Sequence, residues 1–261
     1  MIRSLYTAAT GMDAQQTRMD TIANNLANAS TTGFKKVSAD FEDLLSETIR
    51  SPQQASPQGG SPSLPLQVGL GTRVSSTTRS FSQGDLVQDQ DPYHLAIGGS
   101  GFFRIQRPNG EFAYTRAGDF TTDADGRLVT ASGMLVEPGI TVPKDASKVV
   151  ISTDGLVTAT ITGQTQPAEL GRIELANFTN PAGLEAIGGN LLVETAGSGQ
   201  PTISRPGEQE TGMLQQGWTE SSNVKAVEEM VAMISTQRAY ELNSKVIQSA
   251  DQMLQRLTNV R

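Results

Sequence analysis

The longest regular pattern of apolar positions lies at the C-terminal end of the chain, over residues 224–261. From Trp218 to Arg261 there is neither glycine nor proline, and good helix formers dominate. This composition predicts one uninterrupted helix. At 1.5 Å per residue the helix would be about 55 Å long, well beyond the usual length in compact domains. Ser222 or Asn223 is expected to cap its start.

Two rows of apolar residues run along this predicted helix. Their members recur at helical spacings, and at 100° per residue the two rows lie well apart on the helix surface. A helix with two apolar faces needs neighbours on both. The plain alternative is the central helix of an ordinary bundle, but the sequence offers only one other long helix. The first row is Val227, Val231, Ile234, Leu242, Val246, Ala250, Met253 and Leu257, interrupted by Arg238; the second is Met230, Met233, Tyr240, Ile247 and Leu254.

The other predicted helix lies at the N-terminal end of the chain. Its apolar residues form a heptad seam, and alanines between them keep the helix slim enough for close approach. One such helix can cover one face of the C-terminal helix, so we expect other copies of the same chain to cover the second face. The seam consists of Leu5, Ala8, Met12, Met19, Ile22 and Leu26, with Gln15 as its polar member.

The middle of the chain, from about Gly69 to Ile203, shows the alternation and short apolar runs of β-strands. Glycine-containing pairs between these runs are typical of hairpin turns. Residues 36–50 have a mixed period and predict a short helix or a strand pair. The strands are expected at His94–Ile97, Phe102–Ile105, Phe112–Thr115, Leu128–Thr130 and Val149–Ile151, and the turns at Asn109-Gly110, Asp125-Gly126, Ser132-Gly133 and Asp154-Gly155.

The predicted fold class is therefore α+β, with long N- and C-terminal helices in a coiled-coil-like layer, an inserted antiparallel all-β domain and an extended connecting segment. The helical part comprises residues 1–30 and 224–261. The connecting part comprises residues 31–75 and 208–223, and the outer β domain residues 76–207.

Composition and charge exclude several functions. The net charge is −7 and the longest basic cluster is Lys35-Lys36, which argues against nucleic-acid binding because no basic stripe could neutralise phosphates. No apolar run is long enough to cross a bilayer, and Met1 to Ala29 lacks the order of a cleavable signal peptide. The absence of cysteine excludes disulfides, thiolate catalysis and cysteine-ligated zinc.

Candidate catalytic and metal-binding residues are few. His94 is the only histidine, so a Ser-His-Asp triad or a zinc site would have to use it, but its place at a strand start favours a structural or surface role. The Asp123–Gly126 stretch is similar to the opening of a calcium loop, but loop position 12 is Met134, so a hairpin turn is favoured.

Other polar motifs also have simpler explanations. Gly69-Leu70-Gly71 and Gly98–Gly101 carry no lysine at phosphate-loop spacing, so we interpret them as turns. Glu228-Glu229 is expected to point from a helix surface, where solvation or pairing with Arg238 or Lys245 of another subunit explains it better than acid–base catalysis. We predict no catalytic, cofactor or metal site.

Three blocks of the sequence resemble the bacterial flagellar rod and hook proteins, the axial family of the flagellum. The first is Ala23–Lys35, in which Asn24, Asn25 and Asn28 precede Gly33-Phe34. The others are Gly101-Phe102-Phe103 with Tyr114-Thr115-Arg116, Gly118 and Phe120, and Gly217-Trp218 with Glu220–Val224 followed by Gln237–Glu241 and Asn243-Ser244-Lys245. The resemblance covers essentially the whole chain.

The resemblance implies a non-enzymatic subunit that passes unfolded through the flagellar type III export apparatus and polymerises in the periplasm into a rigid hollow helical tube, without a cleaved signal or direct membrane insertion. Implied partners are copies of itself, the proximal rod protein, the hook protein and the surrounding basal-body ring proteins. The apolar rows, with Asn24, Asn25, Asn28 and Arg238, are the expected assembly interface. The asparagines are also expected to bond freed backbone groups, with Gly33 at positive φ where the chain turns.

Two further segments carry specific expectations. Residues 51–66 are rich in proline, and Pro52, Pro57, Pro62 and Pro65 are expected to stiffen a strap between subunits, although a passive linker is the simple alternative. Phe41, Leu44 and Leu45 resemble the short element by which such subunits engage the export gate; core packing explains them equally well.

Two alternatives remain open. The proline-rich segment and the space for one β domain favour a place in the distal rod, but a proximal rod or hook subunit fits the same motifs. Outside the family, the chain could be a β-rich carbohydrate-binding or hydrolytic module that its helices oligomerise. That function would require a concave cleft with aromatic and acidic residues.

Overall fold

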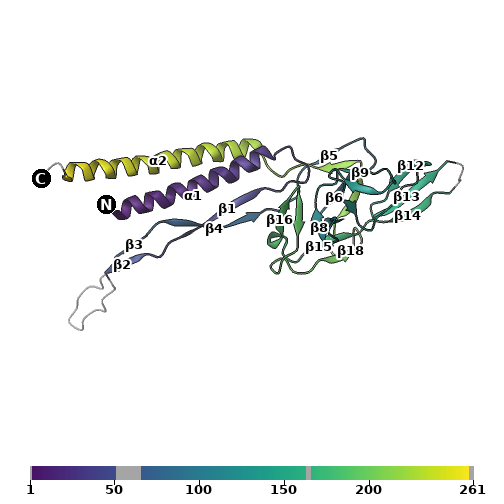
Figure 1. The fold of residues 1–261 in the computed structure, drawn as a ribbon, viewed down its shortest axis with the longest axis horizontal. Coiled ribbons are helices and arrows are strands. Elements are labelled where there is room, and N and C mark those ends of the chain that lie inside the picture. Colours follow the sequence, from purple (N-terminus) through teal and green to yellow (C-terminus); the bar gives the residue numbers. More distant parts are fainter. Residues whose placement is uncertain (1, 51–65, 163–165, 259–261) are drawn as a thin grey trace, which may run out of the picture. The chain divides into compact units, whose positions relative to one another are not determined.

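A computed structural model describes residues 2–50, 66–162 and 166–258 of the chain and has an α+β fold (Figure 1). It divides into two compact units. The helix–ribbon unit comprises Met1–Leu26, Val37–Thr78 and Ala226–Arg261. The β unit comprises Ala27–Lys36 and Arg79–Lys225. Each unit is therefore built from segments that are far apart in the sequence.

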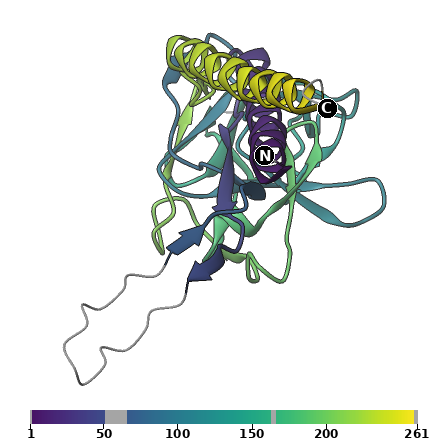
Figure 2. The ribbon, with the colours of Figure 1, turned by 90° about the vertical axis from the view of Figure 1, so that its left-hand side faces the viewer.

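Two long helices dominate the helix–ribbon unit. Helix α1 spans Ile2–Ala27, and α2 spans Ala226–Thr258 with 33 residues, which confirms the two predicted helices. They lie side by side (Figure 1, Figure 2). Glu228 and Glu229 occupy the first turn of α2 and Arg256 its last turn, which suits the helix dipole.

The rest of this unit is a ribbon of paired strands. Strand β1 (Val37–Asp43) pairs with β4 (Thr72–Arg79), and β2 (Glu47–Arg50) runs antiparallel to β3 (Leu66–Val68). For residues 36–50 the sequence predicted a short helix or a strand pair, and the structure has two strands there, β1 and β2. These strands pair with β4 and β3, and not with each other. A two-stranded ribbon is only marginally stable alone, so the ribbon depends on additional contacts.

The β unit contains the remaining strands, all of whose recorded pairings are antiparallel. Its largest sheet has nine strands in the order β16-β17-β8-β7-β11-β10-β9, with β15 paired to both β7 and β18. Strands β12, β13 and β14 form a second sheet, and β6 pairs with β19 and β5 with β20.

The β unit contains the five strands that the sequence predicted, together with others that it did not. All five predicted strands are present, shifted by at most a few residues, and each predicted Gly-containing turn has its glycine at positive φ. The elements are β5 Leu86–Gln88, β6 Leu95–Gly98, β7 Phe102–Gln106, β8 Phe112–Thr115, β9 Phe120–Thr122, β10 Leu128–Thr130, β11 Leu135–Val136, β12 Ala146–Ile151, β13 Leu156–Ile161, β14 Ala168–Arg172, β15 Leu175–Asn177, η1 Pro181–Gly183, β16 Glu185–Gly188, β17 Leu191–Val193, β18 Thr202–Ser204, β19 Met213–Gln216 and β20 Trp218–Glu220.

The main core of the β unit forms where strands present alternate apolar side chains to one side. Phe103 on β7 packs edge-to-face on Phe120 of β9, with ring centroids 4.9 Å apart, and both side chains are fully buried. Leu95 and Ile97 on β6 join the same cluster. This burial gives the β unit a core of its own, built from its own strands.

None of the helices among the described residues has an apolar stretch long enough to cross a membrane.

Candidate assembly surface and buried charge cluster

Helices α1 and α2 approach closely where Gly11 faces Asn243, and several alanines of the two helices are buried. Ala8 and Ala14 on α1 and Ala250 on α2 are buried. A Cβ placed on Gly11 would lie only 2.9 Å from Nδ2 of Asn243, so the helices approach closely at this point. Because small residues allow this approach, the larger apolar side chains of α2 are left on its other faces.

One end of this contact is polar. The Asn25 side chain is buried and donates hydrogen bonds to the carbonyl of Val37 (2.7 Å) and to Glu229 Oε2 (3.2 Å), while its Oδ1 accepts from the Val37 amide (2.9 Å). The prediction that Glu229 points from a helix surface is therefore wrong. Glu229 faces α1 because its position falls on the buried stripe of α2, where Asn25 supplies a partner.

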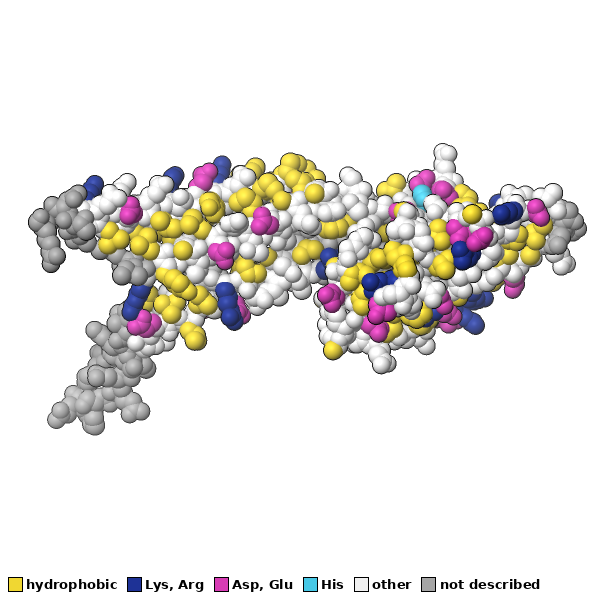
Figure 3. Space-filling model, in the orientation of Figure 1, with side chains coloured by type: hydrophobic (Ala, Val, Ile, Leu, Met, Phe, Trp, Pro, Cys, Tyr) yellow, Lys and Arg dark blue, Asp and Glu magenta, His cyan; other side chains and the backbone are white. Residues whose placement is uncertain are grey.

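The first predicted apolar row of α2 is mostly exposed. Val227 and Leu242 are 70% and 62% exposed, and Ala250 is the buried exception. Figure 3 shows hydrophobic side chains gathered over the surface of the two helices. Isolated exposed apolar residues are ordinary, but a continuous row of them marks an interaction surface. The exposed members are Val227, Val231, Ile234, Leu242, Val246 and Met253, with the exposed Arg238 among them.

The other predicted interface residues divide between seam and surface. In α1, Ile22 is buried, whereas Leu5, Met12, Met19 and Leu26 are half-buried. In the second row of α2, Met233, Ile247 and Leu254 are half-buried and Met230 and Tyr240 are exposed. The buried stripe of α2 thus contains Glu229, Thr236 and Ala250. Only part of the second row is half-buried, and most of the first row is uncovered in the single chain.

The remaining predicted residues are scattered. Phe41 and Leu45 are exposed and Leu44 is half-buried. Asn28 accepts a hydrogen bond from the Thr31 hydroxyl (3.2 Å), and Asn24 is exposed on α1. Pro52, Pro57, Pro62 and Pro65 lie outside the described residues, as does the side chain of Leu257.

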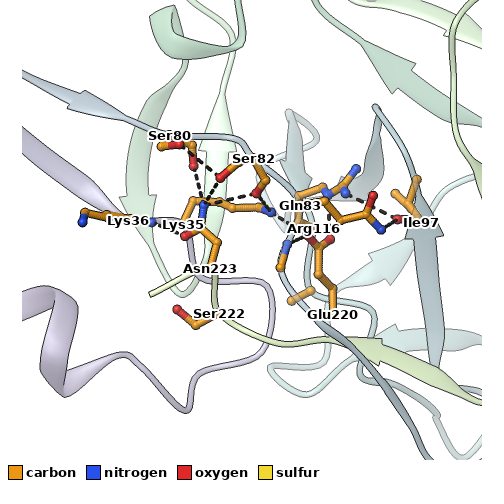
Figure 4. Close-up of polar contacts among 12 residues, drawn as sticks. Lys35, Lys36, Ser80, Ser82, Gln83, Ile97, Arg116, Glu220, Ser222 and Asn223 are labelled. Carbon is orange, nitrogen blue, oxygen red and sulfur yellow. Dashed lines mark hydrogen bonds and ion pairs between the residues drawn. The ribbon is translucent and has the colours of Figure 1, made fainter. Parts of the chain in front are cut away.

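The β unit contains a buried charge cluster that no sequence pattern predicted (Figure 4). The carboxylate of Glu220 is fully buried, and it accepts hydrogen bonds from Lys35 Nζ (2.5 Å), Arg116 Nε (2.9 Å) and the Gly84 amide (2.9 Å). Arg116 also donates to the carbonyls of Gly99 (2.8 Å) and Gly101 (2.7 Å). A buried charge is tolerated when its hydrogen-bonding capacity is filled in this way.

The charges of the cluster shift one another's pKa. Burial alone would raise the pKa of Glu220, but the Arg116 guanidinium and the hydrogen bonds from Lys35 and Gly84 outweigh it, so the pKa lies below its usual value. Burial lowers the pKa of Lys35, and Glu220 only partly offsets this effect. The two cations and the Gly84 amide therefore compensate for the burial of the Glu220 carboxylate.

Hydrogen bonds between the Asn223 side chain and backbone groups connect the same part of the chain. Oδ1 of Asn223 accepts a hydrogen bond from the Lys36 amide (2.7 Å). Its Nδ2 donates hydrogen bonds to the carbonyls of Ser80 (3.0 Å) and Ser82 (3.1 Å). The Ser222 hydroxyl accepts a hydrogen bond from the Val224 amide (3.2 Å). The predicted capping role is thus replaced: Ser222 makes a local bond, and Asn223 links the chain near Lys36 to the chain near Ser80 and Ser82 (Figure 4).

Gly33 lets the chain pass close to the segment that joins β8 to β9. It has φ +68°, as predicted, and its amide donates to the carbonyl of Glu220 (2.8 Å). A Cβ at this position would lie 2.5 Å from the backbone nitrogen of Ala117. Only glycine fits both the conformation and the space.

Replacing Gly33 by alanine should destabilise the β unit more than the same change at Gly110. Gly110 also has positive φ, +85°, but a Cβ there would meet no atom within 4 Å, so Gly110→Ala isolates the conformational cost of about 1–3 kcal/mol. Gly33→Ala adds a backbone clash, and the loss should be larger by more than about 1 kcal/mol. Urea unfolding followed by the fluorescence of Trp218, the single tryptophan, would measure both. Equal losses would contradict the close packing at Gly33.

The polar groups considered for catalysis or metal binding have local structural partners. His94 Nδ1 lies 2.9 Å from Asp89 Oδ2, and this bond lowers the pKa of Asp89. The Asp123 carboxylate accepts hydrogen bonds from the backbone amides of Asp125 (3.0 Å) and Arg127 (2.8 Å), as in a hairpin turn. No cluster of three potential metal-binding side chains occurs within residues 2–50, 66–162 and 166–258.

A cavity of about 420 Å³ does bring aromatic and acidic residues together, as a carbohydrate-binding module would require. Its lining includes Phe81, Phe102, Phe178 and Glu210. However, Phe102 packs edge-to-face on both other rings, with centroids 5.4 and 5.8 Å away, and is itself buried along with Phe178. These rings pack on one another and offer no open stacking platform for a sugar.

Family models match three separate parts of the chain. They are the "Flagella basal body rod protein" model at residues 5–35, the "Flagellar hook protein FlgE/F/G D1 domain" model at 96–159 and the "Flagellar basal body rod FlgEFG protein C-terminal" model at 215–260. Lys35, Arg116 and Glu220 fall in the first, second and third match respectively. The buried cluster is thus the point where the three matched segments meet.

Whole-chain relatives agree with these matches. The chain is 50% identical to flagellar basal-body rod protein FlgG of Caulobacter vibrioides over 100% of both chains. It is 39% identical to FlgG of Bacillus subtilis, again over 100% of both, and 33% identical to rod protein FlgF of Caulobacter vibrioides, over 97% of this chain and 95% of that one. Three matched segments in the expected order and identity along the full length lead to one conclusion: the chain belongs to the flagellar basal-body rod protein family.

Proposed function

We propose that this chain is a structural, non-enzymatic subunit of the flagellar distal rod, in which many copies assemble into a rigid hollow tube that transmits torque and lets exported subunits pass. The observation that carries the proposal is the exposed first row of α2. Its apolar side chains stay uncovered after α1 has packed on the opposite face. Further copies of the chain would bury them and gain the hydrophobic free energy.

The inner layer of this tube would consist of α1 and α2 packed in a coiled-coil-like arrangement between copies. The proposed division keeps residues 1–30 and 224–261 as the inner layer, residues 31–75 and 208–223 as the connecting part and residues 76–207 as the outer β domain. Coverage of a row by neighbouring helices is the usual stabilisation of such long helices, because helical propensity alone contributes little.

Place and partners follow as parts of the same proposal. The subunit would be exported through the flagellar type III apparatus without a cleaved signal, and would span the periplasm in contact with the proximal rod protein, the hook protein and the ring proteins. The exposure of Phe41 and Leu45 supports their availability to the export gate. We retain the strap hypothesis for residues 51–66, and tubes from a chain shortened within 52–64 should bend more easily in electron micrographs.

The test of the proposed function is assembly of the purified chain. Raising the protein concentration should give tubes visible by electron microscopy, and circular dichroism should show a gain of helix relative to the dilute monomer, because the two helices are completed by neighbours. A chain that stays monomeric at every concentration, with both helices fully formed, would overturn the proposal. A proximal rod or hook subunit would instead assemble but fail to restore the distal part of the rod in complemented cells.

A further inference from the structure

A second apolar surface lies in the helix–ribbon unit, away from α2. It is a cavity of about 650 Å³ between the start of α1 and the bend that separates β1 from β2. Its apolar walls are Tyr6, Leu44, Leu45 and Leu70. Tyr6 is 57% exposed and Leu45 88%, so the cavity opens to solvent and is unfilled by the described part of the chain.

The walls of this cavity are held in place by the backbone. The Leu44 amide donates to the carbonyl of Gly71 (2.9 Å), which ties the bend to the segment between β3 and β4. Gly71 has φ +117°, and a Cβ there would overlap the side-chain oxygen of Thr10, so the segment between β3 and β4 packs directly on α1. The cavity is therefore pre-formed, which reduces the entropy cost of filling it.

The charge at its rim is unbalanced. Glu42 forms an ion pair with Arg73, so these two charges compensate each other. Asp43 also lines the cavity and is exposed, and its carboxylate makes no hydrogen bond or ion pair with any residue that the structure describes. The cavity thus combines apolar walls with one uncompensated negative charge.

The exposed face of α2 carries the complementary pattern. Ile234, Arg238 and Leu242 follow one another at four-residue steps on one face, so neighbours are separated by about 6 Å along the helix axis. Ile234 is 52% exposed and Leu242 62% exposed, and the exposed Arg238 between them has no ion pair with any residue in the described part of the chain. The row therefore presents one positive charge between two apolar side chains.

Resting on the proposed self-assembly, we propose that the cavity of one copy receives the Ile234–Arg238–Leu242 row of a second copy, and that Arg238 pairs there with Asp43. Among the described residues, none from α2 lines the cavity, so the row of the same chain does not fill it. Docking removes apolar surface from water on both copies and gives each charge a partner.

The contact between the two copies is heterologous, because the cavity and the row are different surfaces and each copy offers one of each. Heterologous contacts build rings or open helical filaments, and a stack of copies along a tube requires the open form. A dimer that closes on itself would need the same surface on both copies.

Charge reversal tests the pairing. Asp43→Arg and Arg238→Asp should each raise the protein concentration needed for assembly by about 10- to 100-fold, because like charges would then meet in the contact. Combining both changes in one chain should restore assembly to near the unmodified level, since the pair is re-formed with its signs exchanged. Reversal of an exposed charge on another face of the helix, Asp251→Lys, is the matched control and should have a much smaller effect.

Cysteine pairing tests the location, and the natural chain contains no cysteine to interfere. A mixture of the Leu45→Cys chain with the Leu242→Cys chain should form disulfide-linked dimers under mild oxidation when assembled. Either chain alone should not, because a heterologous contact never brings two copies of the same position together. The Ser132→Cys chain, altered at an exposed position of the β unit, should not link to either.

The outcomes separate this proposal from the one on which it rests. If the chain assembles but the charge reversals leave assembly unchanged and the mixture gives no disulfide, the cavity has another occupant, such as residues 51–65 or a different protein, and the pairing is overturned. If the unmodified chain fails to assemble, the proposed function itself fails.

Discussion

Glu220→Gln should lower the free energy of unfolding of the β unit by about 3–5 kcal/mol, the usual cost of leaving buried charges without their partner. The Glu220 side chain is fully buried between Lys35 and Arg116, whose side chains are only 2% and 5% exposed. Glutamine keeps the size of the side chain but removes the negative charge, so two buried cations would remain. Urea unfolding monitored by Trp218, two residues away on β20, would report on this unit directly.

Two further variants make this result specific. Glu185→Gln changes an exposed carboxylate on β16 and should stay within about 0.5 kcal/mol of the unmodified chain. Lys35→Met should cost less than Glu220→Gln, because Glu220 would keep its bond to Arg116. If Glu220→Gln unfolds at the same urea concentration as the unmodified chain, the cluster does not hold the three matched segments together.

The dependence on pH has a defined sign. The pKa of Glu220 is lowered in the folded state, so its contribution is present above the ordinary glutamate pKa and is lost as pH falls through the lowered value. The stability difference between the natural chain and Glu220→Gln should therefore shrink on acidification. The pKa of Lys35 is also lowered, so the unfolded state binds more protons and stability rises with pH as the lysine titrates.

Ile234→Asp should abolish assembly while leaving the β unit folded. Ile234 is about half exposed in the single chain and lies in the middle of the first row, so most of the cost of an aspartate arises when another copy covers it. Burying that unpaired charge would cost about 3 kcal/mol or more, equivalent to at least about a 100-fold rise in the concentration required for assembly. Sedimentation and electron microscopy would measure assembly, and Trp218 fluorescence would confirm that the β unit unfolds normally.

The control for this prediction lies on the same helix. Gln248→Asp introduces the same charge at an exposed polar position outside the first row, and should assemble at nearly the natural concentration. Leu26→Asp, at the half-buried end of the α1 seam, should also prevent assembly. Normal tubes from Ile234→Asp would show that the first row is not a contact between copies.

Local pattern accounts for the elements that were predicted correctly. The helices and the five strands follow from periodicity, since the side chains of each face repeat at 3.6 or two residues. The turns follow from glycine at positive φ, which no other residue adopts so readily. The strand order of the nine-stranded sheet could not be predicted. Pairings such as β7 with β15 join segments that are far apart in the sequence, and no local pattern indicates which strands pair.

The burial of Glu229 in α2 is a second feature that local sequence patterns could not predict. A carboxylate in the first turn of a helix is usually solvated, and nothing around it in the sequence indicates otherwise. The structure places Asn25, 204 residues earlier, within 3.2 Å of it. Burial of a polar residue is decided by whether a distant partner reaches it.

The sequence by itself determined the family, the two long helices, the β-rich middle and the excess of apolar surface on the C-terminal helix, because composition, motif and period are properties of neighbouring residues. Only the tertiary structure decided which row of α2 stays exposed and that Lys35, Arg116 and Glu220 share one buried cluster. Lys35 and Arg116 lie 185 and 104 positions from Glu220 in the sequence, and only the folded chain brings such charges within hydrogen-bonding distance.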